Sequence, residues 1–403
     1  MKYLFYISFL FSVFTVIGQD QYLQIISKID IDPQYNLEDD SKIRLMGFTE
    51  QLGEPITLPS PIITVFEGDS VELNLWNFSQ GAPHTIHLHG LDVDQQNDGV
   101  PHLSFTVEHS EKKSYFFKAP HPGTYLYHCH VASPIHVQAG MYGLIIVKPK
   151  GLYNTTWEGG YIYDAESSLL MSEIDTNWHT IDMIRHHYTD GDVSISIPKY
   201  QPQYFLVNGK SGSQLKEENQ TIKMFKAGTF YLRLANIGNY GNRVIIPASI
   251  NAKIISSDGR PLPEVEFTNE IEVMPGERYG VLIETTDSLM DSIHVEYFNL
   301  NTSELAGQET INIVVLNTLN TRDLSNTIEI YPNPITNGWI QVDIPSSNIY
   351  SKEFQLFDLA GRIVRKGQFE GNKIDFQEIK NGNYILKIKL DREVIFHKVT
   401  IVN

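Results

Sequence analysis

Residues 63–77 read ITVFEGDSVELNLWN, with two runs of alternating apolar and polar residues on either side of Gly68 and Asp69. This alternation predicts two β-strands joined by a tight turn, because successive side chains of a strand point to opposite faces. Further short strands, separated by Pro and Gly, are predicted at 112–120 (KKSYFFKAP), 123–131 (GTYLYHCHV) and 140–149 (GMYGLIIVKP). Strands at this spacing predict a Greek-key β-sandwich over residues 22–150.

The same pattern continues through the rest of the chain. Residues 152–318 contain YFLVNGK (204–210), TFYLRLANIGNYGN (229–242) and IEVMPGERYGVLIETT (271–286), which predict a second sandwich. The polar stretch 317–327 precedes a third group of short strands over 325–403, long enough for a small sandwich of its own. Segments with helical periodicity are scarce, so the sequence predicts an all-β fold of three domains.

The first 18 residues, MKYLFYISFLFSVFTVIG, carry Lys2 and then an uncharged apolar run. They predict a secretory signal peptide that is cut before Gln19. No later segment has the roughly 20 apolar residues of a spanning helix, so we expect a secreted or cell-surface protein without a membrane span. The net charge of −17 argues against nucleic acid or an anionic membrane as a partner.

An exported protein usually employs cysteine in disulfides, yet this sequence has one cysteine, Cys129. It can form an intermolecular bridge, remain a buried thiol or bind a metal as a thiolate. Its surroundings, YHCHVASPIHVQAGMYG (127–143), are rich in metal-ligand side chains, and a second histidine cluster, PHTIHLHG, lies at 83–90. This combination favours a metal site.

Strand alternation sorts these residues into two sets. His128 and His130 share a face and Cys129 points to the other, while His84 points away from His87 and His89 if that strand is regular. The first set, here called the cysteine group, is His84, Cys129, His136 and Met141, with a bend at Pro134 expected to return the last two to the metal from a loop. The second set, the histidine group, is His87, His89, His128 and His130.

The cysteine group has the ligands of a blue-copper site: two imidazoles, a thiolate and a weak axial thioether. The histidine group suits copper that binds a small oxidant. Cys129 is covalently bonded to His128 and His130, so electrons would have a short bonded path between the groups. Asp98 is interpreted as a turn residue or as a proton relay near the histidine group. The other histidines are expected at the surface (His102, His109, His121) or as structural or exposed residues (His179, His186, His187, His294, His397).

At these residues the chain resembles the multicopper oxidases, which are built from linked cupredoxin domains. The segments HTIHLHG (84–90), HCH (128–130) and NDGVP (97–101) carry the resemblance. It implies that His84 and Cys129 bind a type 1 copper, and that the histidine group binds the trinuclear copper cluster. Residues 152–318 are similar to the family's middle domain, which normally carries no copper. Residues 325–403 are similar to the C-terminal sorting domain of type IX secretion cargo, through YPNP, LFDLAGR and NGNYILKI.

The resemblance is incomplete, because the family's trinuclear cluster has eight histidines from two domains and this chain offers four. Two copies of the first domain in a homo-oligomer, a trimer or dimer-based, would complete the cluster. Otherwise the histidine group binds fewer coppers or none. The order Cys129, His136, Met141 is also similar to trimeric copper nitrite reductases, although these have Asp where this chain has His87 and lack the second His of the His-Cys-His.

Three functions follow as hypotheses. The leading one is a laccase-like copper oxidoreductase that takes electrons from a small-molecule or protein donor and reduces oxygen, with Cys129, His128, His130 and Asp98 as its catalytic residues. The second is nitrite reduction, with His294 of a neighbouring chain as a possible contributor. The third is a non-catalytic electron carrier or copper-binding protein.

Overall fold

The computed structural model describes residues 19–150, 154–185, 197–316, 329–332, 335–336, 338–343, 352–357, 363–369, 371–390 and 393–402. The predicted signal peptide and the polar stretch 317–327 lie outside these residues. The chain divides into two compact units, Met1–Leu316 and Asn317–Asn403. Within the described part, no helix is long and apolar enough to cross a membrane.

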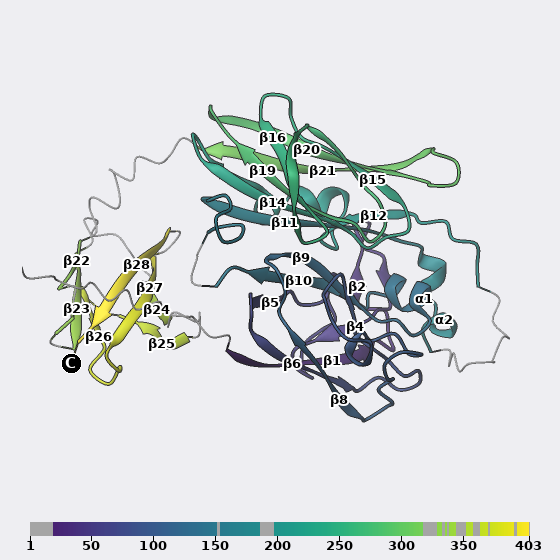
Figure 1. Cartoon of the computed structure of the whole chain (residues 1–403), viewed down its shortest axis with the longest axis horizontal. Helices are drawn as coiled ribbons and strands as arrows, with labels where there is room; N and C mark the ends of the chain where they lie inside the picture. The colour runs from purple at the N-terminus through teal and green to yellow at the C-terminus, as the bar shows by residue number, and fades with distance from the viewer. Residues whose placement is uncertain are drawn as a thin grey trace, which may run out of the picture. The chain divides into compact units, whose positions relative to one another are not determined.

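The first half of the first unit is a sandwich of two four-stranded sheets (Figure 1). One sheet has the order β4 (Met46–Thr49), β1 (Asp20–Ile29), β6 (Ser70–Asn77), β8 (Lys112–Lys118). The other has the order β5 (Ile63–Phe66), β10 (Tyr142–Lys148), β9 (Gly123–His128), β7 (His87–His89). Alternate apolar residues of both sheets, such as Leu73 and Tyr127, form a shared buried core that also contains Cys129.

The second half of this unit is a larger sandwich. Its first sheet has the order β12 (Tyr204–Val207), β11 (Ala165–Ile174), β14 (Thr229–Asn236), β19 (Arg278–Glu284), β16 (Asn251–Ser257), β17 (Arg260–Phe267). Its second sheet has the order β13 (Ile222–Phe225), β21 (Leu305–Leu316), β20 (Leu289–Phe298), β15 (Gly241–Ile245), β18 (Glu270–Val273). The buried apolar core between these sheets includes Leu232, Val281 and Ile293.

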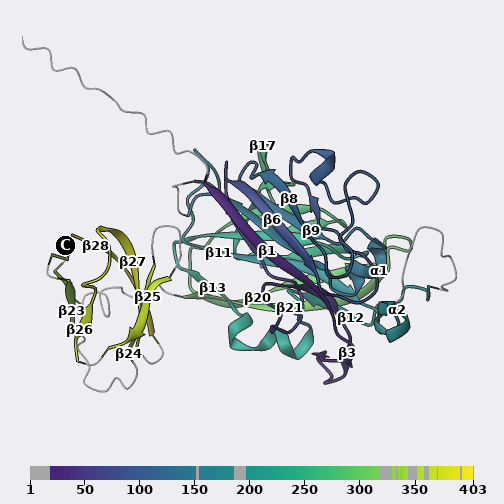
Figure 2. The ribbon, with the colours of Figure 1, turned by 90° about the horizontal axis from the view of Figure 1, so that it is seen from below.

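Short elements connect the strands. They are β2 (Tyr35–Asn36), β3 (Lys42–Ile43), α1 (Ser133–Gln138), α2 (Ile181–Arg185) and the 3₁₀ turns η1 (Gln95–Asn97), η2 (Thr176–His179), η3 (Gly212–Lys216) and η4 (Glu218–Gln220). Figures 1 and 2 both show α1 beside α2. The first helix carries His136 of the predicted cysteine group.

The two halves of the first unit pack directly on each other, with β9 of the first against β14 and β19 of the second (Figure 1). Arg233 of β14 is 2% exposed, forms an ion pair with Glu166 and donates a hydrogen bond to the hydroxyl of Thr124 on β9 at 3.0 Å. The ion pair lies within the second half, and the hydrogen bond to Thr124 links it to the first. Lys148 of β10 in the first half pairs with the same Glu166, so this charged network spans both halves.

The second unit contains two further antiparallel sheets. One has the order β22 (Glu329–Tyr331), β23 (Trp339–Asp343), β26 (Lys373–Asp375), and the other β25 (Ile363–Gln368), β24 (Lys352–Phe357), β27 (Gly382–Leu390), β28 (Glu393–Ile401). Buried side chains from both sheets, including Val342 and Leu386, form its core. The predicted all-β fold is therefore confirmed, while the exact domain boundaries stay predictions.

Candidate metal centre

The cysteine group is assembled by the end of β9 and the turn that follows it. Cys129 is the first residue after β9, and its amide donates a hydrogen bond to the carbonyl of Met141 at 3.0 Å. The amide of Met141 in turn donates to the carbonyl of His136 at 3.0 Å. These main-chain bonds bring three residues that are separated along the sequence to one end of the sandwich.

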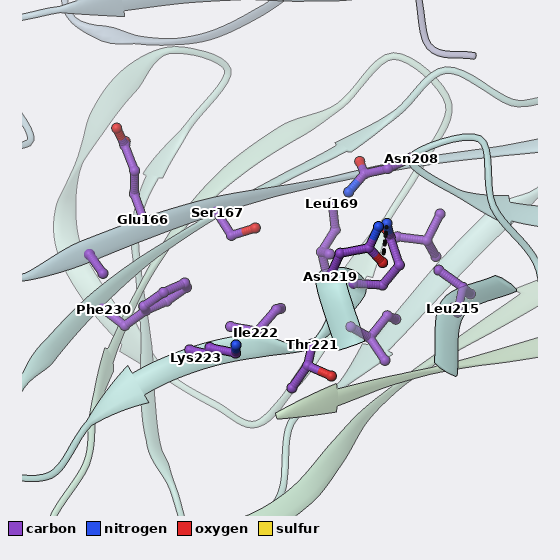
Figure 3. Close-up of a pocket in the computed structure, with 14 residues that line it drawn as sticks. Glu166, Ser167, Leu169, Asn208, Leu215, Asn219, Thr221, Ile222, Lys223 and Phe230 are labelled. Carbon is purple, nitrogen blue, oxygen red and sulfur yellow. Dashed lines mark hydrogen bonds between the residues drawn. The ribbon is translucent and has the colours of Figure 1, made fainter. Parts of the chain in front are cut away.

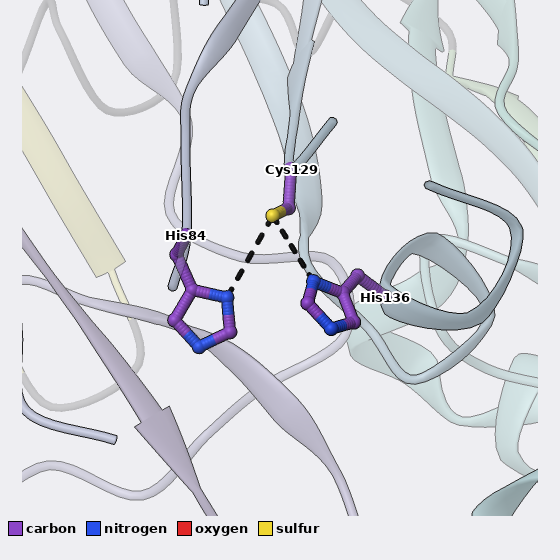
Figure 4. A group of neighbouring side chains, drawn as sticks. All are labelled: His84, Cys129 and His136. Atoms are coloured by element: carbon purple, nitrogen blue, oxygen red, sulfur yellow. Dashed lines mark hydrogen bonds between the residues drawn. The ribbon is translucent and has the colours of Figure 1, made fainter. Parts of the chain in front are cut away.

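Three side chains of the cysteine group, those of His84, Cys129 and His136, converge on one point (Figure 4). The Sγ atom of Cys129 lies 3.7 Å from Nδ1 of His84 and 3.2 Å from Nδ1 of His136. These three donor atoms all lie within 4.8 Å of one another. A thiolate and two imidazole nitrogens in this arrangement suit copper. Met141 is fully buried in the same core cluster as Cys129, and its carbonyl accepts the hydrogen bond from the Cys129 amide.

The interior of this group strongly disfavours charge without a metal. Burial raises the pKa of the Cys129 thiol to about 11 and lowers the pKa of His136 to about 3. Burial, followed by the neighbouring His136, lowers the pKa of His84, whose Nε2 is buried without a hydrogen-bond partner among the described residues. A bound cation would stabilise the thiolate that burial disfavours, so the residues fit a metal that tolerates soft ligands.

The path to His136 differs from the expected loop. Residues 133–138 form the short helix α1, with Pro134 in its first turn, and His136 projects from that helix. Proline is well tolerated there because the first helical amides have no partner within the helix. The chain turns into this helix at its N-cap, Ala132, which has a left-handed backbone conformation with φ of 43°.

The histidine group follows from the pairing of β7 with β9. His87 lies opposite His128 in this antiparallel pair, and their ring centroids are 5.1 Å apart. Nδ1 of His89 is 3.4 Å from Nε2 of His128, and the ring of His130 is 5.3 Å from that of His87. The donor atoms of His87, His89 and His128 lie within 4.8 Å of one another. The sequence therefore identified four side chains that do come together.

The hydrogen bonds of His87 and His128 to main-chain carbonyls determine which ring nitrogens carry the proton. Nδ1 of His87 is 2.7 Å from the main-chain carbonyl of Asp98, and Nδ1 of His128 is 3.0 Å from the carbonyl of Cys129. Each Nδ1 must carry the proton to donate to a carbonyl, so Nε2 of both rings is an acceptor. Burial lowers the pKa of His128 to about 3, which keeps that ring neutral.

Asp98 ends the turn η1, where its amide donates to the carbonyl of Gln95, and its side chain also lies against the histidine group. Its role as a proton relay stays a prediction. Its Oδ1 atom is 3.5 Å from Nδ1 of His87, and its side chain is 25% exposed. The carboxylate therefore connects the histidine group with solvent. Its main-chain carbonyl, rather than its carboxylate, makes the shorter contact that orients the ring.

The second half of the unit contributes two residues that the sequence did not single out. A Cβ atom on Gly276 would lie 3.1 Å from Cε1 of His89, so this glycine packs closely on the ring. Arg278, which is 5% exposed and paired with Asp258 at 2.9 Å, lies against Gly90. Burial, followed by the charge of Arg278, lowers the pKa of His89 to about 4. A weak sign was their position in the segment VMPGERYG, which connects β18 to β19.

Most of the remaining histidines lie apart from both groups. His102 and His109 are exposed, as expected, and His121 is partly buried. His179 is buried, with Nδ1 2.7 Å from the carbonyl of Arg44, and His294 pairs with the hydroxyl of Thr310 at 3.1 Å. His186 and His187 lie outside the described residues, as does the side chain of His397.

A cavity of about 290 Å³ opens between β11 and β13 in the second half (Figure 3). Glu166 and Lys223 are among its lining residues, but Glu166 is already paired with Arg233 and Lys148. None of the predicted site residues lines it. It therefore adds nothing to the metal centre.

Three family models match the chain. Two models described as "Multicopper oxidase" match residues 50–151 and 176–318, and a model described as "Secretion system C-terminal sorting domain" matches residues 329–402. An iron transport multicopper oxidase, FET3, of Candida albicans is 26% identical over 258 residues, which cover 61% of this chain and 36% of that protein. A copper-containing nitrite reductase of Neisseria gonorrhoeae is 33% identical over 176 residues, or 42% of this chain and 41% of that protein.

The aligned part of the chain thus spans less than half the length of either relative. Among solved structures, the blue copper oxidase from Nitrosomonas europaea is similar with a TM-score of 0.57 and 26% identity, over 73% of this chain and 86% of that chain. The match spans most of that structure, which supports the cupredoxin-like description of the fold.

Proposed function

Because this chain belongs to the multicopper oxidase family through its first two domains, we propose that it is a copper oxidoreductase that passes electrons from the cysteine group to oxygen at the histidine group. The observation that carries this proposal is the position of Cys129 between His128 and His130. Its side chain faces His84 and His136, whereas those of its two neighbours face the rings of β7.

The first site would be held by His84, Cys129 and His136, with Met141 beside them, and the second by the histidine group. Copper bound at these sites would supply one-electron oxidation of a donor and reduction of oxygen. The chain itself supplies the bonded path through the main chain on both sides of Cys129. It also excludes water from the cysteine group, whose two histidines are at most 1% exposed.

Reduction of oxygen at the histidine group consumes protons as well as electrons, and we assign the transfer of protons to Asp98. Its carboxylate is partly exposed and lies 3.5 Å from Nδ1 of His87, so it can exchange protons with solvent beside the ring. Carboxylates and histidines are the usual side chains for such transfer. In this role Asp98 acts as a proton relay, and the shorter bond from His87 to its carbonyl keeps the ring oriented.

We further propose that a second copy of the chain completes the histidine group. Four imidazoles gather there among the described residues, half the number that the family resemblance implies for a full cluster. The side chain of His87 is 19% exposed, so the group is open to solvent on one side. Closed symmetric oligomers are the common way in which one chain supplies both halves of a site. The sorting-domain match supports export of this oxidoreductase through type IX secretion.

The test is copper stoichiometry and oxygen consumption of the purified protein, measured together with its oligomeric mass. We expect a blue absorption band, more than one copper per chain, an oligomer, and oxygen consumption with a phenolic donor. One copper per chain without oxygen consumption would overturn the oxidase and leave an electron carrier. A colourless copper-loaded protein would overturn the cysteine group as a blue-copper site.

Nitrite reduction is the second candidate, supported by the 33% identity to a copper-containing nitrite reductase. A carboxylate beside a histidine, as in Asp98 and His87, also suits protonation of nitrite oxygen. Nitric oxide formed from nitrite and a reductant, without oxygen consumption, would favour this function. Nitrite-independent oxygen consumption would exclude it as the main activity.

A further inference from the structure

The helix that carries His136 is held from both sides. His136 and Gln138 are two positions apart in α1, which places them about 200° apart around the helix. His136 faces Cys129, at 3.2 Å, and Gln138 faces the second half of the unit. The position of the cysteine group therefore depends on what binds Gln138.

The side chain of Gln138 pairs with the end of β11 as a further strand would. Its Nε2 donates to the main-chain carbonyl of Glu173 at 2.6 Å, and its Oε1 accepts from the main-chain amide of Asp175 at 2.9 Å. Both bonds are buried, since Gln138 is 7%, Glu173 2% and Asp175 0% exposed. Water cannot readily replace either partner there.

The strand edge at this point is available because β14 has already ended. The last pair between β11 and β14 joins Met171 and Asn236, whereas β12 still pairs with Ile174 on the other side. The carbonyl of Ile174 accepts from Gln203, so the carbonyl of Glu173 faces the opposite edge, where Gln138 lies. The carboxamide thus occupies the place that a neighbouring strand has left.

Apolar packing supports the same contact. Ile135, the residue before His136, is buried in a small cluster with Trp178 and Met183, which belong to η2 and α2 of the second half. Figures 1 and 2 show α1 and α2 next to each other. Ile135 and Gln138, one on each side of His136 in the sequence, therefore anchor α1 to the second half of the unit. Among the described residues, that half contributes no side chain to the cysteine group.

We propose that Gln138 is a positioning residue that fixes His136 by tying α1 to the end of β11, so that the second half sets the geometry of the cysteine group. This inference rests on the proposed function, in which the cysteine group binds copper. Groups that orient metal ligands tune both the affinity and the potential of a site, because they restrict where the ligand atoms lie.

The experiment compares Gln138→Met, which keeps the side-chain length without the amide, with Gln203→Met. Gln203 is the control because it bonds to the same end of the strand without touching α1: its Oε1 accepts from the amide of Thr176 at 2.9 Å, and its Nε2 donates to Oδ1 of Asp175 at 3.4 Å. Its substitution therefore loosens the end of β11 while it leaves the two bonds to Gln138 in place. In the copper-loaded full chain we measure the blue absorption band, the copper hyperfine coupling by electron paramagnetic resonance, and the midpoint potential. We also measure copper loss to a chelator, in each case together with the thermal midpoint.

We expect Gln138→Met to shift the band and the potential and to weaken copper binding about 10-fold or more, whereas Gln203→Met keeps the parent spectrum and affinity. Gln138→Glu retains only the acceptor for the amide of Asp175, so its spectral shift and its loss of copper affinity should lie between those of Gln138→Met and the parent. If Gln138→Met does not fold, Gln138→Glu provides the test of the inference. Parent-like spectra and affinity in the folded Gln138 variants would overturn the inference. A parent without a blue band would instead overturn the proposed function.

Discussion

His87 on β7 lies directly opposite His128 on β9, with ring centroids 5.1 Å apart. The register of one antiparallel pair thus brings together two histidines that are 41 residues apart in the sequence. Because the side chain of Cys129 points to the other face, the same pairing also separates the two groups. A substitution on one face of this strand pair should therefore affect the group on that face and leave the other group unchanged.

Gly276 should be needed for copper binding at the histidine group. In Gly276→Ala, the new Cβ would lie 3.1 Å from Cε1 and 3.3 Å from Nε2 of His89, so the ring must shift. We expect about 10-fold weaker copper binding at the histidine group, with the blue band unchanged. Copper titration followed by metal analysis measures this.

The matched control is Gly68→Ala. Gly68 has φ of 80°, close to the 85° of Gly276, but a Cβ atom on Gly68 would have nothing within 4 Å. Both variants should lose stability to a similar extent, about 1–2 kcal/mol, because alanine is strained in a left-handed conformation. Equal loss of copper in the two variants would contradict a specific role for Gly276.

Cys129→Ser should abolish the blue band while the protein still folds. Serine has nearly the same volume, but its hydroxyl is a poor ligand where a soft thiolate is required. Absorption spectra of the copper-loaded protein and circular dichroism of the fold provide the measurement. His102→Ala, at an exposed histidine outside both groups, is the control and should keep the parent spectrum. A blue band that survives in Cys129→Ser would refute the thiolate assignment.

Asp98→Asn should slow turnover without loss of copper. The main-chain carbonyl that accepts from His87 at 2.7 Å remains, whereas the carboxylate at 3.5 Å loses its charge and its ability to carry a proton. We expect oxygen turnover to fall by about 100-fold, with a changed pH–rate profile and an unchanged blue band. A variant with parent-like turnover across the pH range would exclude Asp98 as the relay.

Glu173 should make the stability of the protein depend on pH. Burial raises the pKa of this carboxyl from its usual 4.5 to about 7, although the hydroxyl of Tyr200 and two main-chain amides donate to it. The folded state then binds a proton more tightly than the unfolded state. The resulting stabilisation is complete below about pH 4.5 and is lost as the pH rises through 7.

Glu173→Gln should remove that dependence, because an amide does not titrate. Between pH 4.5 and 7 the free energy of unfolding of the parent should fall by up to about 3 kcal/mol relative to the variant. Urea unfolding at a series of pH values measures the difference. Glu266→Gln, at an exposed position on β17, should follow the parent curve. Parallel curves for Glu173→Gln and the parent would contradict the prediction.

Much of the candidate site was predictable because it depends on the two-residue period of a strand. Alternation placed Cys129 on the face opposite to His128 and His130 and sorted the ligand-type residues into the two groups. The family resemblance implied His84 and Cys129 of the first group and all of the second. The bend at Pro134 was predicted less well, since proline in the first turn of a helix and proline in a loop give the same local signal. Only the tertiary structure distinguishes them.

The contacts between the two halves had no comparable signal. Gly276 and Gln138 act through contacts with residues far away in the sequence, at His89 and at the end of β11, and neither belongs to a type that binds metal. The sequence predicted a second domain without copper ligands but did not predict its contacts with the first. The contacts of the second half with α1, which carries His136, depend on tertiary structure alone.

The tripeptide His128–Cys129–His130 tolerates no change in its length without an effect on both groups. One residue inserted or deleted within it would turn every following side chain to the opposite face, so the thiol and one imidazole would exchange sides. An insertion or deletion that changes the cysteine group would therefore also change the histidine group. The two sites are therefore expected to be inherited, or lost, as one unit.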